Sequence, residues 1–396
     1  MKTLIELYDE RPIENVLASE VFRPERTVFL CPQDIIRNKQ LVAKLKEYYI
    51  YRGLDTELVF LESSMYNADK LLKQLQNVVR KYPDCVVDIT GGTDAALFAC
   101  GRLTETDDTP AFTYSRKRGC FFDIHKAPFA DNVRCSLAHT VEDCFRMAGG
   151  NMRTGRVDNG ILKNYIGTFD GFFGTYFSAR SEWNSFVGYI QTVSAQSKNA
   201  KLSLDVSAPY TVKNERGRKT DCNEKILLRL ADLGYIKKLR IDRGQLVSFS
   251  FADSRIRTWL RDVGSVLELY VYKAALDSGR FNDVVTSAVV DWEGVGGKDA
   301  VTNEIDVMAM AGIVPVFISC KTCAVTTEAI NELAVLRDRF GGYGAKAIIV
   351  TSQYCRSITR HRAFELGIIV LDLNDLKTGD LSEKLADTID GGMNRY

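Results

Sequence analysis

The sequence predicts an α/β protein with more than one domain, and three observations support this fold class. The chain has 396 residues, which is more than a single hydrophobic core usually serves. Over the first 150 residues, short apolar runs alternate with segments of helical spacing, as they do in a mostly parallel, doubly wound sheet. The same alternation returns in the last third of the chain and predicts a second α/β unit there.

The elements of the first unit follow from its apolar runs. These runs predict strands at 27–31, 56–62 and 84–90, separated by helices at 34–51, 67–82 and 94–103. Two further strands, "PAFTYSR" and "GCFFDI", are expected to pair around a turn at Lys117–Gly119. The first clear strand is therefore expected at residue 27. The polar stretch 8–18 precedes it, and the pattern gives no reason to place that stretch near a site.

The middle of the chain has a weaker pattern. One helix is expected near 178–195, and the polar residues 197–220 are typical of a linker or an exposed loop. A helix at 223–233, followed by two strands that turn at Asp242–Gly244, is similar to the end of a winged helix. The expected elements of the last third are helices at 262–277, 326–340 and 357–366 and strands at 283–291, 303–310, 313–320, 345–351 and 368–372.

Composition limits the possible functions. Because the net charge is only +1, any nucleic-acid contact must come from a local basic patch. Acidic residues stand where a secretory signal would be apolar, and no apolar run approaches the length of a membrane span, so we expect a cytoplasmic protein with no membrane contact. Ten scattered cysteines are expected as buried thiols, and three distant histidines disfavour zinc sites and histidine-based triads.

The stretch "DITGGTD" (88–94) leaves a predicted strand through two glycines and enters a predicted helix. In open parallel sheets, ligands bind at such carboxyl ends of strands. Gly91 and Gly92 let the backbone approach a ligand, and the N-terminus of the next helix suits a phosphate. Thr90 and Thr93 add hydroxyl donors. Two alternatives are a cap at Thr93 and a plain tight turn. The stretch lacks the fingerprints of dinucleotide-binding and P-loop proteins.

A second polar pattern lies in the two runs "NEIDVMAM" and "IVPVFISCK", which are expected to pair as a hairpin. If the turn is Ala311–Gly312, then Asp306 faces Phe317 and Glu304 faces Ser319. Side chains alternate between the two faces of a strand. One face would then carry a polar group of side chains, namely Glu304, Asp306, Ser319 and Lys321.

Acids and a lysine on one face have a known chemical use. Carboxylates hold Mg²⁺ or Mn²⁺, and a lysine can stabilise charge that develops on a phosphodiester. Glu268 is a candidate outer acid, since its apolar neighbours leave a carboxylate in need of a partner. A salt bridge between strands is the alternative explanation of the pattern.

The two patterns together resemble the CARF nucleases of type III CRISPR defence, in which a Rossmann-like CARF domain is joined to a PD-(D/E)xK restriction-endonuclease-like domain. The resemblance covers nearly the whole chain. It rests on the stretches "LYDERPIENVLA", "DITGGTD", "LELYVYKAAL", "FNDVVTSAVVDW", "NEIDV", "FISCKT" and "LRDRFGGYGAKA". It implies a CARF domain at 1–150, a linker region with a winged-helix-like segment at 151–260, and a nuclease domain at 261–396.

The resemblance also implies an activity. We expect a homodimer that binds the second messenger cyclic tetra-adenylate, a cyclic oligoadenylate, and then cleaves single-stranded or nicked DNA and RNA with Mn²⁺ or Mg²⁺. The resemblance assigns the activator to Thr90, Gly91, Gly92 and Thr93, and cleavage to Glu268, Asp306 and Lys321. Ser319 stands where the nuclease superfamily has its second acid. Glu304 is the substitute that the hairpin register offers, and Glu328 is a weaker one.

Two other functions remain open from the sequence. A ligand-responsive transcription regulator would use the 223–251 segment to bind duplex DNA, but it would leave Asp306 and Lys321 without a role. A ring nuclease that degrades its own activator would use the glycine turn, but it would leave the C-terminal domain without a role.

Overall fold

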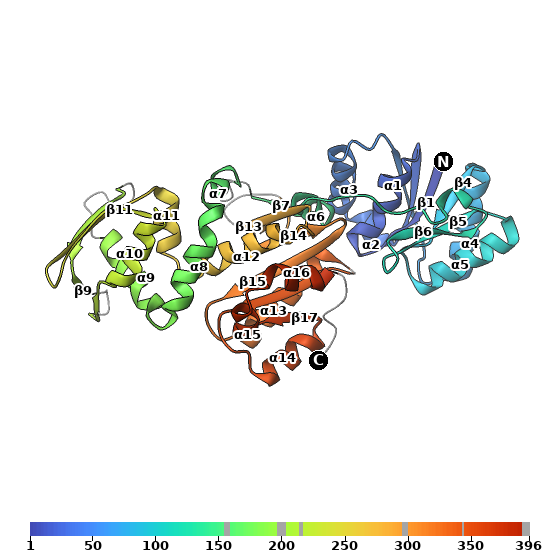
Figure 1. Ribbon diagram of the computed structural model, residues 1–396. Coiled ribbons are helices and arrows are strands. Elements are labelled where there is room, and N and C mark those ends of the chain that lie inside the picture. Colours follow the sequence, from blue (N-terminus) through green and yellow to red (C-terminus); the bar gives the residue numbers. More distant parts are fainter. Residues whose placement is uncertain (154–158, 196–202, 214–216, 295–299, 343, 390–396) are drawn as a thin grey trace.

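The computed structural model describes residues 1–153, 159–195, 203–213, 217–294, 300–342 and 344–389. Figure 1 shows three parts: an N-terminal α/β domain, a C-terminal α/β domain beside it, and a smaller unit built from the middle of the chain on the far side of the C-terminal domain. The predicted α/β fold class with parallel strands is confirmed. No helix among the described residues is long and apolar enough to cross a membrane.

The N-terminal domain contains one six-stranded sheet. Across the sheet the strands are β3 (Glu57–Glu62), β2 (Arg26–Cys31), β1 (Thr3–Leu7), β4 (Cys85–Asp88), β5 (Ala111–Ser115) and β6 (Cys120–His125). All neighbouring strands are parallel except the β5–β6 hairpin, which is antiparallel as predicted. Helices between and beside them are η1 (Pro12–Asn15), α1 (Leu17–Phe22), α2 (Gln33–Arg37), α3 (Lys39–Tyr51), α4 (Ala68–Lys81) and α5 (Asp94–Asp107).

Two expectations for this domain were wrong. The first strand is β1 at Thr3–Leu7, in the middle of the sheet, and not the strand at residue 27. The sequence pattern did not reveal β1, because Glu6 interrupts its apolar run although the Glu6 side chain is buried. Burial raises the pKa of Glu6 well above its usual value. The helix expected at 34–51 is two helices, because Asn38 ends α2 and caps α3 by accepting from the Leu41 amide.

The C-terminal domain is built on a second six-stranded sheet. Its strands, in spatial order, are β17 (Ile368–Leu371), β16 (Lys346–Thr351), β15 (Val314–Lys321), β14 (Thr302–Ala311), β13 (Asp283–Asp291) and β7 (Asn151–Met152). The helices of this domain are α12 (Ser265–Asp277), α13 (Thr327–Leu336), α14 (Ser357–Glu365), α15 (Leu373–Lys377) and α16 (Leu381–Ile389). Side chains of α12 and α16 join the core on one face of the sheet, and those of α13 and α14 join the core on the other.

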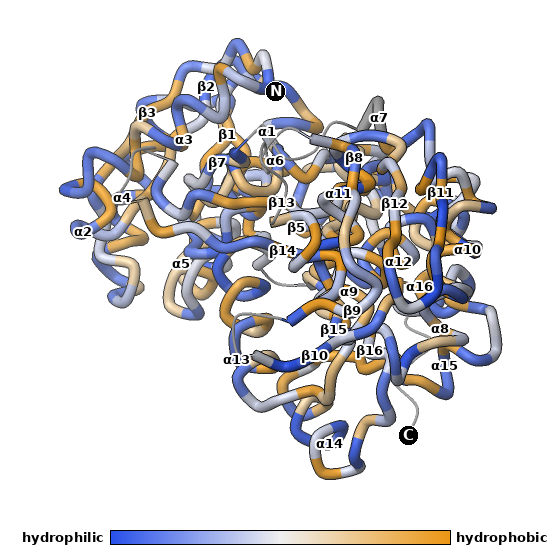
Figure 2. The backbone as a smooth tube through the Cα atoms, turned by 90° about the vertical axis from the view of Figure 1, so that its left-hand side faces the viewer, coloured by the Kyte–Doolittle hydropathy of each residue, from blue (hydrophilic) through white to orange (hydrophobic). Residues whose placement is uncertain are grey.

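The middle unit combines helices with a small antiparallel sheet of order β11–β12–β8. Its elements are α7 (Asn159–Tyr165), α8 (Phe169–Ser178), α9 (Arg180–Ala195), β8 (Asp205–Pro209), β9 (Thr211–Lys213), β10 (Lys219–Asp221), α10 (Glu224–Asp232), β11 (Ile236–Asp242), β12 (Leu246–Phe251) and α11 (Ser254–Leu260). The expected helix and hairpin are present, and Figure 2 shows β11 as a hydrophilic strand. The stretch 197–220 is not only loop, because β8 pairs with β12.

The helix α6 (Val141–Met147) joins the two α/β domains. Its Val141, Cys144 and Phe145 lie in the same hydrophobic cluster as Met308 and Phe317 of the C-terminal sheet. On its other side, Arg52 of the N-terminal domain forms an ion pair with Asp143 at 3.2 Å. The chain therefore leaves the N-terminal sheet and packs directly against the C-terminal one.

Candidate functional site

The turn of the polar hairpin in the C-terminal domain lies one residue later than the sequence predicts, and this shifts the pairing of the two strands by two residues. Val307 pairs with Ile318, and Ala311 pairs with Val314, so Gly312 and Ile313 form the turn. Gly312 has a φ of +61°, which suits the first central position of a type II′ turn. The expected pairs, Asp306 with Phe317 and Glu304 with Ser319, are therefore wrong. A shift of two residues nevertheless keeps Asp306, Ser319 and Lys321 on one face.

Asp306 lies where β14 and β15 separate. Its Oδ2 accepts a hydrogen bond of 2.6 Å from the Cys320 amide and one of 3.2 Å from the Ser319 hydroxyl. The Lys321 ammonium lies 3.8 Å from the same oxygen. Structure and sequence thus agree that Asp306, Ser319 and Lys321 come together, although Ser319 is next to Asp306 and not opposite Glu304. The carboxylate replaces a strand carbonyl as the partner of the Cys320 amide.

Three of the predicted acids line one cavity of about 610 Å³: Glu268 on α12, and Glu304 and Asp306 on β14. Burial raises the pKa of Glu268 to about 8, and the nearby charges of Asp306 and Glu304 add to this increase. Such crowding of acids in a cavity is typical of functional sites and is relieved by a cation. Among the described residues, no three potential ligands are close enough together to hold a metal ion as they stand. The acids therefore line the same cavity without forming a complete metal site.

The weaker candidate, Glu328, lies exposed on the first turn of α13. A smaller cavity of about 70 Å³ on the other side of the hairpin is lined by Asp306, Lys321 and Glu332. Glu332, one turn beyond Glu328, was missed. Its helical spacing from Glu328 was the available signal, but the sequence could not show which turn of α13 faces the hairpin.

In the N-terminal domain, the hydroxyls of the glycine turn are already used within the protein. Thr90 donates its hydroxyl to Asp88 and accepts a hydrogen bond of 2.9 Å from the Tyr114 amide. Thr93 donates to the Met65 carbonyl and accepts from the Ala96 amide at 3.2 Å, which makes it the cap of α5. The alternative reading of Thr93 as a helix cap is therefore confirmed. These hydroxyls hold the shape of the turn.

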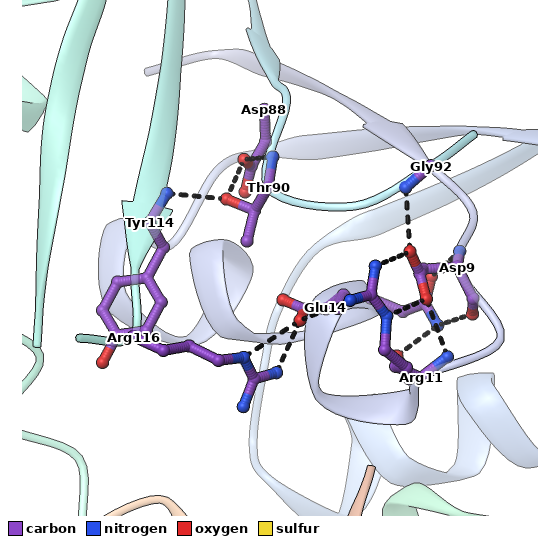
Figure 3. A network of polar contacts seen from close by, with 9 residues as sticks. Asp9, Arg11, Glu14, Asp88, Thr90, Gly92, Tyr114 and Arg116 are labelled. Carbon is purple, nitrogen blue, oxygen red and sulfur yellow. Dashed lines mark hydrogen bonds and ion pairs between the residues drawn. The ribbon is translucent and has the colours of Figure 1, made fainter. Parts of the chain in front are cut away.

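The two glycines let the turn pack against the loop that follows β1. The Gly92 amide donates to Asp9 Oδ2 at 2.9 Å, and a Cβ on Gly92, whose φ is +96°, would lie 2.8 Å from the Leu7 Cβ. A Cβ on Gly91 would lie 3.0 Å from the Asp9 Cβ. The polar stretch 8–18, for which the sequence gave no position, thus lies directly beside the glycine turn, as Figure 3 shows.

Two arginines complete this part of the structure (Figure 3). Arg11 donates to both carboxylate oxygens of Asp9, at 2.7 and 2.6 Å. Arg116 donates to Glu14 Oε1 at 3.2 and 2.5 Å. Neither arginine was among the candidates. The available signal was their position, since each follows a strand of the parallel sheet and so lies at the edge where ligands bind.

Two acids near the turn, Asp88 and Glu6, are almost completely buried. Asp88 accepts a hydrogen bond of 2.7 Å from the Thr90 amide, but burial raises the pKa of Asp88 to about 7. Burial, with the charges of Asp88 and Glu14, also raises the pKa of Glu6. Arg11 and Arg116 supply the positive charge beside these acids that would attract an anion to the turn.

Comparisons with known proteins agree with this architecture. Residues 255–390 match the family of Card1-like endonuclease domains. The fold resembles that of the protein VC1899 from Vibrio cholerae, with a TM-score of 0.76 and 16% identity over 100% of this chain and 99% of the other. It also resembles that of Can2 from Sulfobacillus thermosulfidooxidans in complex with cyclic tetra-adenylate, with a TM-score of 0.67 and 16% identity over 100% of both chains. A search of curated proteins gives no significant match.

Proposed function

We propose that the chain is a CARF nuclease of type III CRISPR defence, an endonuclease that cyclic tetra-adenylate activates and that requires Mn²⁺ or Mg²⁺. The proposal includes a homodimer acting on single-stranded or nicked DNA and RNA. The observation that carries it is the pairing of Asp306 with Lys321 beside a cavity of carboxylates, inside the segment that matches Card1-like endonuclease domains. The fold shared with Can2, solved with cyclic tetra-adenylate, supports the activator.

The donor set of the cavity fits a divalent metal ion. Asp306, Glu268 and Glu304 offer carboxylate oxygens, which Mg²⁺ and Mn²⁺ prefer. Burial and then the neighbouring acids raise the pKa of Glu268, and a bound cation would offset both effects. Glu304 stays a candidate because it lines this cavity, although it does not face Ser319. When bound, the metal ion would polarise the phosphodiester and lower the pKa of a water molecule.

Lys321 contributes the positive charge that the protein itself brings to the reaction. Its ammonium is close enough to Asp306 to be held near the cavity, and it is about one third exposed. It can therefore orient the attacking water or stabilise negative charge that develops on the phosphate. Asp306 has two functions in this proposal, since one of its oxygens also fixes the Cys320 amide and with it the end of β15.

For the activator, we place the phosphates at the glycine turn. Thr90, Gly91, Gly92 and Thr93 shape the backbone before the N-terminus of α5, where a helix favours anions. Arg11 and Arg116 can exchange a carboxylate partner for a phosphate. A cyclic tetranucleotide can have twofold symmetry, which a homodimer would match. The exposed apolar side chains of Tyr66, Leu97 and Phe98, on elements flanking the turn, support such an interface.

A chain of contacts supports activation across the domains. His139 forms a buried hydrogen bond of 2.9 Å with Glu20 of α1. Burial alone would raise the pKa of Glu20, but this bond and other polar contacts lower it to about 2. The His139 amide donates to the Gly312 carbonyl at 3.0 Å. Asn282 completes the connection, since it donates to the His139 carbonyl and accepts from the Gly312 amide, both at 2.7 Å. His139 and Asn282 thus connect the N-terminal domain to the tip of the hairpin that carries Asp306.

Replacing Asn282 with alanine should weaken this connection. The variant loses two hydrogen bonds at the hairpin tip but no part of either site, so we expect the ratio of activated to basal cleavage to fall by roughly five- to tenfold. Calorimetry should show unchanged affinity for cyclic tetra-adenylate. The matched control is Asn77→Ala on α4, where the side-chain amide oxygen accepts an exposed hydrogen bond from the neighbouring Arg80. An activation ratio equal to that of the parent protein would show that the hairpin tip does not carry the signal.

One experiment separates the three candidate functions. The purified protein is incubated with plasmid and with labelled RNA, with Mn²⁺ or EDTA, and with or without cyclic tetra-adenylate. We expect cleavage that needs both the metal ion and the activator. Sequence-specific duplex binding without cleavage would favour the transcription regulator. Loss of the activator alone, with intact plasmid and RNA, would favour the ring nuclease.

A further inference from the structure

The cavity that holds the acids has a second wall with different chemistry. This wall is α11, which follows the β11–β12 hairpin of the middle unit and contributes Arg255, Thr258 and Trp259. An acidic wall and a wall with a cation and a large aromatic side chain therefore face the same space. The volume of about 610 Å³ is in the range of sites that hold a small ligand or a segment of a larger one.

The aromatic ring of Trp259 is held in place. It makes edge contacts with Tyr165 at 5.6 Å and with Phe169 at 5.7 Å between ring centroids. Tyr165 in turn donates its hydroxyl to Asp253, the cap of α11. Trp259 nevertheless stays half-buried and reaches the cavity. A fixed and partly open aromatic ring loses little conformational entropy when a base stacks on it.

Arg255 gives this wall its charge. The other charged residues that line the cavity are Asp262, Glu268, Glu304 and Asp306, which would repel the phosphates of a nucleic-acid strand. Arg255 is partly exposed. Its backbone amide donates a hydrogen bond of 2.9 Å to the carboxylate of Asp253, which caps α11 and fixes the start of this helix. A guanidinium here can bind a phosphate that lies next to the one being cut.

We propose that Trp259 and Arg255 form a nucleotide subsite of the nuclease, in which Trp259 stacks on one unpaired base and Arg255 binds a neighbouring phosphate. The base must be unpaired, because the faces of a paired base are covered within a duplex. The subsite rests on the proposed nuclease function and goes beyond it by assigning substrate contacts to α11. It also explains why the cavity is enclosed by two different parts of the chain.

The test uses the full-length protein, cyclic tetra-adenylate and a labelled single-stranded oligonucleotide, with binding measured by anisotropy in EDTA. A second set of oligonucleotides carries one abasic nucleotide at successive positions. For the parent protein, we expect one abasic position to weaken binding about tenfold or more. For Trp259→Leu, binding should be weakened by a similar factor, and the abasic position should have no further effect. Trp259→Phe should recover part of the affinity.

Arg255→Gln is expected to lower the salt dependence of binding by the equivalent of one phosphate contact, a slope change of roughly 0.7. Arg261→Gln, at the exposed end of the same helix and outside the cavity, is the control. Equal sensitivity of Trp259→Leu and the parent protein to the abasic position would overturn the subsite alone. A parent protein that neither binds nor cuts any strand would overturn the proposed function, and the subsite with it.

Discussion

The Lys321→Ala and Asp306→Asn variants are expected to lose cleavage by at least about a hundredfold, which is the usual cost of removing one group that stabilises transition-state charge. The Lys321 ammonium lies 3.8 Å from Asp306, and "ISCKT" offers no substitute for it. Asparagine retains an oxygen that can accept from the Cys320 amide, so Asp306→Asn should preserve the end of β15. Rates are measured with labelled single strands at saturating activator and Mn²⁺.

These variants have clear controls. Lys346→Ala, at the start of the neighbouring strand β16, should cut normally, and both inactive variants should bind cyclic tetra-adenylate like the parent protein in calorimetry. Normal cleavage by Lys321→Ala would exclude the hairpin as the catalytic site. Glu304→Gln tests which acid holds the metal ion together with Asp306. If this variant needs a higher Mn²⁺ concentration for half-maximal activity, Glu304 is a ligand. If the Mn²⁺ titration is unchanged, Glu268 is the partner of Asp306.

Removing both arginines beside the glycine turn should abolish activator binding. Hydrogen bonds to charged groups contribute about 1.5–3 kcal/mol each, so Arg11→Ala combined with Arg116→Ala is expected to weaken the affinity by more than about a hundredfold. Calorimetry with cyclic tetra-adenylate measures this loss. Cleavage should fall to its basal rate, since the acids of the C-terminal domain are untouched.

Arg118→Ala is the matched control for the arginine variants, because Arg118 is exposed on the β5–β6 turn and its guanidinium lies over the Phe122 ring. A double variant that binds the activator as tightly as the parent protein would remove this region from the activator site. A bulky residue at Gly92 would be a poorer test, since its Cβ would collide with Leu7 and its φ of +96° is strained for other residues.

The sequence predicted which polar side chains of the hairpin come together because strand alternation is a local property. Asp306 and Lys321 share a face in any register of the expected parity, so they come together although the predicted strand pairing was wrong by two residues. The turn itself could have been placed better. Gly312 is followed by Ile313, and glycine at the first central position is typical of a type II′ hairpin.

The surroundings of the glycine turn were harder to predict because their parts are distant in the chain. The loop after β1 lies beside the glycine turn only because β1 and β4 are neighbours in the sheet, and the buried Glu6 concealed β1. Hydroxyls that looked like ligand donors at Thr90 and Thr93 have partners from Tyr114 and Met65 that only the fold brings close. The same holds for Trp259, which lines one cavity with Glu304 and Asp306 although both are distant from it in the chain.

The most direct test of the account is a titration of cleavage rate with cyclic tetra-adenylate at a protein concentration far above the dissociation constant. A labelled single strand and Mn²⁺ are supplied in excess, and the initial rate is recorded as activator is added. We expect a very low rate without activator and a linear rise that stops at one activator for every two chains. The same cleavage rate at every activator concentration would contradict a nuclease controlled by its N-terminal domain.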